Sequence, residues 1–293
     1  MTFAETAQAE TGPRLEVPAR HEGAKAMLLT VFGEFVLPAG GAAWTSSLVA
    51  AAGSLDIGEK NARQAIARIG DQGIIEPVRH GRRVRWNLSE PGRALLEHGT
   101  RRIYSFRTTT VGWDGEWLLA YVPVAESERA ERNQLRNRLG FLGFGELSPS
   151  LLVSPHLDRE PELRRVLDQL GLAGESIVLH STAGASDDDA GVVERAWDLD
   201  RLAEAYDDFS SIHASRRPGD AEETFRALVE LVHAWRRFPF ADPELPTELL
   251  PEGWVGTTAA QAFHECHENW SAAAQQWFAE LEARQTTPLA ART

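Results

Sequence analysis

Residues 58–88 read GEKNARQAIARIGDQGIIEPVRHGRRVRWNL, and the fold of the N-terminal part of the chain follows from this stretch. Its first half predicts a helix that Gly73 closes, because the apolar residues Ala62, Ala65, Ile66 and Ile69 share one face. Its second half predicts a β-hairpin, in which the turn residues His80–Gly81 precede a strand whose apolar residues alternate with Arg and Asn. The stretch therefore predicts a helix followed directly by a hairpin with arginines at its tip.

The residues before this stretch supply two further helices. Residues 24–38 show apolar side chains at helical spacing, and Pro38 with the Gly40–Gly41 pair ends that helix. Thr45 then caps a short helix that Gly53 ends. Three short helices followed by a hairpin are the layout of a winged helix-turn-helix, in which the third helix enters the major groove of DNA and the hairpin lies along the phosphate backbone.

The distribution of charge supports this interpretation. The whole chain carries a formal net charge of −13, yet eleven basic and five acidic residues lie between Gly58 and Arg107, so this segment carries +6 and the rest −19. A basic segment in an acidic protein is the expected footprint of a module that binds a polyanion such as nucleic acid. The alternative is a solvated, charged helix beside an exposed hairpin, with no nucleic-acid partner.

The predicted DNA contacts fall into two groups. On the outward face of the third helix we expect residues that hydrogen-bond base edges, because Arg pairs with guanine and Asn or Gln with adenine. In the hairpin we expect arginines that neutralise phosphates. The helix residues are Lys60, Asn61, Arg63, Gln64 and Arg68, and the hairpin residues are Arg79, Arg82, Arg83 and Arg85.

Length and composition bound the rest of the molecule. A chain of 293 residues has room for two or three domains, and its single cysteine, Cys266, rules out an intramolecular disulfide framework. The N-terminal residues form no secretory signal, and no apolar run reaches the roughly 20 residues that a membrane helix needs. We therefore expect a soluble, cytoplasmic protein that has no membrane partner.

The predicted fold class is α+β, with an N-terminal winged helix-turn-helix, a central ferredoxin-like α+β domain and a C-terminal helical domain. The central prediction rests on buried strands near residues 115–124, 151–153 and 175–183, with helices between them. From Leu199 onward the spacing of apolar residues is helical. The expected boundaries are a disordered tail at 1–20, a DNA-binding domain at 21–107, a ferredoxin-like domain at 108–196, a helical domain at 197–285 and a tail at 286–293.

Several stretches, taken in order along the chain, resemble the PaaX family, named for the transcriptional repressor of phenylacetic acid degradation. They are LLTVFGEFVLP and GGAAW near the start, then NARQAIARIGDQGIIEPVRHGRRVRWNLSEPGRALLEHGTRRIY, WDGEW, RNRLGFLGFGELSPSLLVSPH and AWRRFPFADPELPTELLPEGWVG. The last is the most specific, because a helix end, DPELP and LLPEGWVG follow one another.

The resemblance implies a DNA-binding transcriptional repressor of a catabolic operon for phenylacetate or related aromatic acids, with no enzymatic activity. It implies a homodimer on an inverted-repeat operator of double-stranded DNA. It further implies that a CoA thioester of an aromatic acid, typically phenylacetyl-CoA, acts as effector and releases the DNA. It also implies that the central domain is related to small CRISPR-associated nucleases. No cofactor is expected. A regulator that binds DNA without a ligand remains an alternative.

A CoA thioester needs cations for its phosphates and an apolar slot for its acyl group. The stretch HAWRRFPF offers both, so His233, Arg236, Arg237 and, further along, Trp254 are the predicted ligand-binding residues. The alternative is that the aromatic residues are core and that the arginines complement a helix dipole.

Two alternative interpretations give the chain a catalytic site or a metal site. A metal-dependent nuclease of the related type needs an aspartate at the end of its first strand, whereas here no carboxylate follows until Glu126. His264 and His267 are spaced to share one helix face and so to hold zinc, but the third ligand is missing from their surroundings in the sequence. We expect no catalytic residues, and the metal question stays open at this point.

Overall fold

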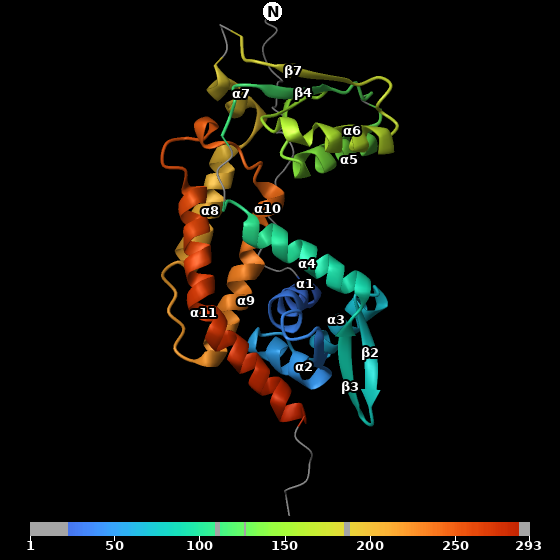
Figure 1. Ribbon diagram of the computed structural model, residues 1–293, viewed down its shortest axis with the longest axis vertical. Helices are drawn as coiled ribbons and strands as arrows, with labels where there is room; N and C mark the ends of the chain where they lie inside the picture. The colour runs from blue at the N-terminus through green and yellow to red at the C-terminus, as the bar shows by residue number, and fades with distance from the viewer. Residues whose placement is uncertain (1–22, 109–111, 126, 185–187, 287–293) are drawn as a thin grey trace, which may run out of the picture. The chain divides into compact units, whose positions relative to one another are not determined.

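The structure, a computed structural model, describes residues 23–108, 112–125, 127–184 and 188–286 (Figure 1). The tails expected at 1–20 and 286–293 lie outside these ranges, except for residue 286. Contacts divide the described chain into two compact units. The central unit comprises the described part of 110–205 together with Phe238–Trp254, and the terminal unit comprises the described parts of 18–109 and 255–293 together with Tyr206–Arg237.

The terminal unit combines helices from both ends of the chain with one small sheet. Its elements are α1 (Ala24–Val31), the π-helical η1 (Phe32–Val36), β1 (Ala42–Trp44), α2 (Thr45–Ser54), α3 (Glu59–Asp71), β2 (Ile75–His80), β3 (Arg83–Leu88), α4 (Glu90–Ser105), α9 (Ala221–Trp235) and α11 (Val255–Thr286). Helix α8 (Leu199–His213) belongs to this unit from Tyr206 onward.

The helix and the hairpin expected from residues 58–88 are confirmed as α3 and β2–β3. The four apolar residues predicted for the inner face of α3 are all buried. The sheet also contains a strand that the sequence did not predict, β1, which pairs antiparallel with β3 and gives the order β1-β3-β2. A three-residue strand is too short to show a periodicity of its own, so only its pairing reveals it.

Helices α9 and α11 pack against the N-terminal helices because both groups carry wide apolar faces. Phe35 contacts Phe225 of α9 and Phe278 of α11, with ring centroids 4.8 and 5.5 Å apart. All three rings are almost completely buried. These helices therefore share a core with the N-terminal segment. The helical domain expected over residues 197–285 stays a prediction.

A close approach of backbones joins the hairpin to α4. Ser89 caps α4 by accepting a hydrogen bond from the Gly92 backbone N–H at 3.0 Å. A Cβ atom on Gly92 would lie 2.0 Å from the Ile74 carbonyl oxygen at the base of the hairpin, so no larger residue fits there. Glycine thus lets α4 begin directly against the first strand of the hairpin.

The central unit contains an antiparallel sheet in the order β5-β6-β4-β7. Its strands and helices are β4 (Trp117–Tyr121), α5 (Arg129–Phe141), β5 (Gly145–Ser148), β6 (Leu151–Ser154), η2 (Leu157–Arg159), α6 (Glu160–Gln169), β7 (Ile177–Ser181), α7 (Asp189–Ala196), α10 (Phe238–Ala241) and η3 (Thr247–Leu249). The order β-α-β-β-α-β of its first six main elements is the ferredoxin-like order. The expected single strand near residues 151–153 is in fact the hairpin β5–β6.

Two apolar clusters cover the two faces of this sheet. Leu118 and Leu152 point toward α5 and α6, which lie side by side on one face (Figure 1). Trp117 and Val153 point to the opposite face, where they pack against α7 and the segment around Leu245. The fold is thus α+β. Successive side chains of β4 and β6 point to opposite faces of the sheet, so that helices can pack on both faces.

The stretch DPELP, the most specific part of the resemblance, is tied to the central unit. His156 Nε2 lies 3.0 Å from the Pro243 carbonyl oxygen, and Arg159 forms an ion pair with Glu244 at 3.3 Å. Burial lowers the pKa of His156, so its ring is neutral near neutral pH and Nε2–H donates to the Pro243 carbonyl.

No helix among the described residues is both long enough and apolar enough to span a membrane.

Candidate nucleic-acid interface

The outward face of α3 carries all five predicted base-reading residues. Lys60, Asn61, Arg63, Gln64 and Arg68 are exposed, on the side opposite the buried apolar residues. Arg63 forms an ion pair with Glu59 at 2.9 Å, one turn earlier on the same helix. That pair is exposed and therefore weak, so it leaves the arginine able to exchange its partner. The arrangement presents a polar, basic helix face to solvent.

The hairpin divides its four predicted arginines between two faces and a turn. Residues that pair across an antiparallel ladder lie on the same face, so Arg79 shares a face with Val84, its partner across the ladder. Arg83 and Arg85 lie on the other face, because they alternate with Val84 along the strand. Arg82 follows Gly81, whose φ of 63° makes the turn, and it is exposed at the tip.

Arg83 and Arg85 meet a residue that the sequence reasoning missed as a functional candidate, Trp44. The register pairs Trp44 with Arg85, and the guanidinium carbons of Arg83 and Arg85 lie 4.9 and 5.7 Å from its ring centroid. His80 adds an edge contact to the same ring at 5.2 Å. Cation–π attraction acts at these distances, so Arg83 and Arg85 are both held against one indole.

The C-terminal end of α11 contacts the same place. The Trp44 backbone N–H donates to Glu282 Oε1 at 3.0 Å, and the Ser47 hydroxyl donates to the Leu281 carbonyl oxygen at 3.3 Å. Arg83 donates to the carbonyl oxygen of Gln285. The interface expected from residues 58–88 is therefore supported by a helix that lies about 200 residues later in the chain.

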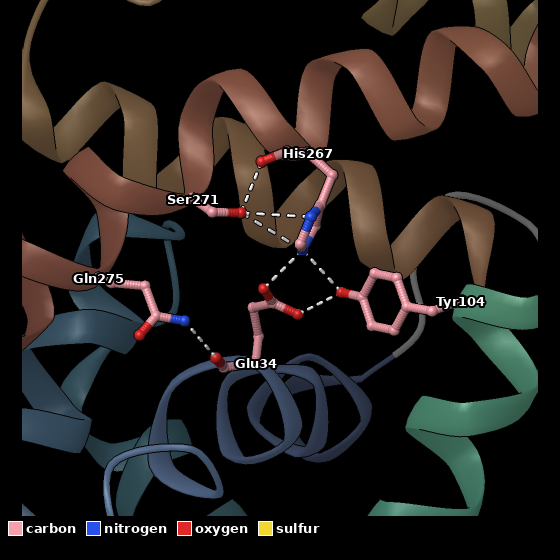
Figure 2. Close-up of polar contacts among 5 residues, drawn as sticks. All are labelled: Glu34, Tyr104, His267, Ser271 and Gln275. Atoms are coloured by element: carbon pink, nitrogen blue, oxygen red, sulfur yellow. Dashed lines mark hydrogen bonds and ion pairs between the residues drawn. The ribbon is translucent and has the colours of Figure 1, made fainter.

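A second polar cluster in the terminal unit joins η1, α4 and α11 (Figure 2). The Glu34 carboxylate, only 8% exposed, accepts a hydrogen bond from the Tyr104 hydroxyl and lies 2.8 Å from His267 Nε2. The Glu34 carbonyl oxygen accepts from Gln275 Nε2 at 3.0 Å, and the Ser271 hydroxyl lies 3.2 Å from His267 Nδ1. The side-chain carboxylate and the backbone carbonyl of Glu34 are thus both bonded to α11.

The electrostatics of this cluster keep Tyr104 protonated. Burial and the neighbouring Glu34 carboxylate raise the pKa of Tyr104 well above its usual value, so its hydroxyl remains a donor. The sequence signal for the cluster was weak, because Glu34 stands within an apolar stretch. The one signal is the carboxylate in the middle of VFGEFV, because a carboxylate that is buried needs a hydrogen-bonding partner.

The metal reading of His264 and His267 finds no support in the described part of the chain. His267 is bonded to Glu34 and Tyr104, as Figure 2 shows. No group of three or more His, Cys, Asp or Glu side chains among the described residues is arranged to hold a metal ion. Glu126, the first carboxylate after β4, lies outside the described ranges.

The predicted ligand-binding residues belong to different units. His233, Arg236 and Arg237 belong to the terminal unit, and Trp254 belongs to the central unit, where it is buried. His233 Nδ1 lies 3.0 Å from the Thr30 hydroxyl oxygen, so this histidine links α9 to α1. The neighbouring Trp235 is fully buried and stacks on Phe263, with centroids 4.8 Å apart.

Comparisons with known proteins give a consistent picture. Family models match three consecutive segments: that of the PaaX-like protein over residues 23–92, that of the PaaX protein central Cas2-like domain over 110–193, and that of the PaaX-like protein C-terminal domain over 197–280. The chain is 29% identical over 268 residues to the transcriptional repressor PaaX of Escherichia coli strain K12, covering 87% of this chain and 82% of that protein.

A solved structure shares the fold. An uncharacterized protein from Mycobacterium tuberculosis superposes with a TM-score of 0.56 at 23% identity, covering 89% of this chain and 96% of the other. At that identity the likeness concerns the fold alone. Because three models of one family match in order along most of the chain, the protein belongs to the PaaX family.

Proposed function

We propose that this protein is a transcriptional repressor that binds duplex DNA through α3 and the β2–β3 hairpin, in the manner of a winged helix. The observation that carries the proposal is the exposed basic face of α3 next to a hairpin that carries four arginines. Membership of a family that includes a transcriptional repressor supports the same role. In this reading α3 lies in the major groove and the hairpin along the backbone.

A homodimer is part of the proposal, because an inverted-repeat operator needs two recognition helices about 34 Å apart or at a multiple of one turn. The long C-terminal helices are rich in aromatic residues, but most of these are buried inside the terminal unit. The central sheet carries a group of exposed apolar side chains: Tyr121 is 44% exposed, and Ile177 and Leu179 are each 53% exposed. These three share one face of the β4–β7 pair and favour it as the surface between two copies.

DNA binding is tested with variants of the two predicted surfaces. Arg82→Ala is expected to weaken binding to every duplex by about tenfold and to lower the slope of log K against log salt by about 0.9, the loss of one phosphate contact. Gln64→Ala is expected to change the preferred base at one position, because it removes a base-edge contact. Fluorescence anisotropy on duplexes from the region upstream of the protein's own gene and on mixed-sequence duplexes measures both.

A half-buried arginine outside the basic segment provides the control for these measurements. Arg138 on α5 of the central unit is hydrogen-bonded to Gln169, and Arg138→Ala is expected to leave DNA binding unchanged. Sedimentation of the complex is expected to give two chains per operator. If Arg82→Ala binds with the affinity and salt slope of the unmodified protein, the assignment of the hairpin is wrong, and one chain per operator contradicts the dimer.

The proposed effector is a CoA thioester of an aromatic acid such as phenylacetyl-CoA, which lowers the affinity for DNA. By linkage, such a ligand binds less tightly to the DNA-bound protein than to the free protein. We expect phenylacetyl-CoA to raise the melting temperature and to release a bound operator duplex, whereas phenylacetate without the CoA moiety does neither at the same concentration. Thermal shift and anisotropy measure the two effects, and acetyl-CoA is the control for the acyl group. A regulator that acts without a ligand would show neither effect with any aryl-CoA ester.

A further inference from the structure

Two neighbouring arginines at the tip of the hairpin are held very differently. Arg82 is exposed, and the described residues form no hydrogen bond, ion pair or ring contact with its side chain. Arg83, the next residue, has its guanidinium carbon 4.9 Å from the centroid of the Trp44 ring and donates to the carbonyl oxygen of Gln285. One of the two side chains is therefore free to sample rotamers, and the other is restrained on two sides.

The restraint on Arg83 leaves it able to bind an anion. A guanidinium has five N–H donors in one plane. In Arg83 the Trp44 ring covers one face of that plane, and the Gln285 carbonyl oxygen accepts from one of the donors. The residue remains exposed, so other donors are available. An arginine that is already oriented loses less side-chain entropy when it binds a phosphate than a mobile one does.

Trp44 is itself fixed by the C-terminal end of α11. Its ring is buried, with 6% of the residue exposed, and its backbone N–H donates to Glu282 Oε1 at 3.0 Å. One turn along α2, the Ser47 hydroxyl donates to the Leu281 carbonyl oxygen at 3.3 Å. Three residues in the last turns of α11 therefore bond to the sheet and to α2: Leu281 to α2, Glu282 to β1 and Gln285 to β3.

We propose that Trp44 and the C-terminal end of α11 position Arg83 as the pre-organised phosphate contact of the hairpin, whereas Arg82 acts as a mobile point charge. Glu282 is then a positioning residue, which acts on DNA binding through Trp44 and Arg83. This inference rests on the proposed DNA-binding function and adds a third element, α11, to the surface that carries it. It also means that a displacement of α11 changes the affinity for DNA without touching α3.

The first test compares lysine replacements at the two arginines. Lys keeps the positive charge but has no planar fork, so it cannot stack on Trp44 and donate to Gln285 as Arg83 does. On a short mixed-sequence duplex we expect Arg83→Ala and Arg83→Lys both to bind about tenfold more weakly. Arg82→Ala is expected to weaken binding, and Arg82→Lys to bind like the unmodified protein. Anisotropy titrations over a salt series measure the affinities and the slopes.

The second test addresses Glu282. Glu282→Ala is expected to weaken binding severalfold, and Glu282→Gln to restore it, because the amide oxygen of Gln accepts the same hydrogen bond from Trp44. A double-mutant cycle gives the readout that a merely structural contact would not move: Glu282→Ala combined with Arg83→Ala is less than additive, and Glu282→Ala combined with Arg82→Ala is additive. Thermal unfolding of each variant establishes that it is folded.

The possible outcomes separate this inference from the proposed function. If the unmodified protein does not bind duplex DNA, the function itself fails. If it binds DNA and loses affinity with Arg82→Ala but tolerates Arg83→Lys, only the positioning of Arg83 is wrong. If Glu282→Gln and Glu282→Ala both strengthen binding, Glu282 acts by charge repulsion and not through Trp44. Should Glu282→Ala fail to fold, the comparison of the two lysine variants decides.

Discussion

Replacing Glu34 by alanine is expected to lower the free energy of unfolding by about 3 kcal/mol, because a buried hydrogen-bonding group that loses its partner costs about 1–3 kcal/mol and Glu34 has two such partners. The carboxylate is the acceptor for the Tyr104 hydroxyl and lies 2.8 Å from His267 Nε2, so its loss leaves both groups without that partner in a largely buried site. Tyr104 cannot relieve the loss by ionising, because burial raises its pKa.

Two further variants separate the charge of Glu34 from its hydrogen bonds. Glu34→Gln keeps an acceptor for Tyr104 and is expected to cost about half as much as the alanine variant. Glu280→Ala, in an exposed pair with Arg284 on α11, is expected to cost less than about 0.5 kcal/mol. Urea denaturation followed by circular dichroism measures all three. A cost for Glu34→Ala no larger than that for Glu280→Ala would show that the cluster contributes nothing to stability.

The contrast between α3 and Glu34 shows which parts of the molecule the sequence could predict. The inner face of α3 and the alternation along β3 repeat with a period of their own, so a window of about a dozen residues contains the signal. The exposed basic residues of the interface follow from the same periodicity, because an amphipathic helix with a known inner face has a known outer face. These predictions needed no knowledge of tertiary contacts.

The contacts that complete the interface have no such local signal. Trp44 and Glu282 are separated by 238 positions, and nothing in the residues around either of them specifies the other. The strand β1 consists of three residues and exists only through its pairing with β3. The π-helical segment η1 likewise depends on its surroundings, since Gln275 of α11 binds the Glu34 carbonyl oxygen there. Long-range pairing decides each of these features.

The domain division has the same cause. Helical spacing after Leu199 predicts helices but does not say which apolar faces meet. In the structure Phe35 packs against rings of α9 and α11, and the stretch that contains Pro243 is bonded to His156 of the central unit. The C-terminal third of the chain is thus shared between two units. The sequence shows that its helices have apolar faces, but the division depends on which of these faces fit together.

The protein is expected to lose stability on mild acidification because of one buried histidine, His213. Burial, with a smaller contribution from the positive charge of Arg216, lowers the pKa of His213 from its usual 6.5 to about 4. The residue is 4% exposed, and among the described residues its Nδ1 has no hydrogen-bond partner. The ring is therefore neutral in the folded protein, and its protonated form is favoured only when the chain unfolds.

The sign of the effect follows from proton binding. Between the folded pKa and the unfolded pKa the unfolded chain binds more protons, so the stability contributed at neutral pH is lost as the pH falls through this window. From about pH 7 to about pH 5 this amounts to about 2 kcal/mol. His213→Phe preserves the contact with the Phe209 ring, whose centroid lies 4.9 Å away, and removes the titrating group. We expect the variant to lack this part of the pH dependence and to equal or exceed the stability of the unmodified protein at the lower pH.

Urea denaturation of His213→Phe and of the unmodified protein at both pH values gives the free energy of unfolding that each loses between them. Subtracting one loss from the other cancels the contributions of the titrating groups that the two proteins share. His98, exposed on α4, provides the matched control: His98→Phe is expected to leave the pH dependence as it is in the unmodified protein. If His213→Phe and the unmodified protein lose the same stability between the two pH values, His213 is not the group that burial holds neutral. If only the unmodified protein and His98→Phe lose this stability, the acid sensitivity belongs to the ring of His213. This residue contacts α11, because Cys266 donates to the His213 carbonyl oxygen.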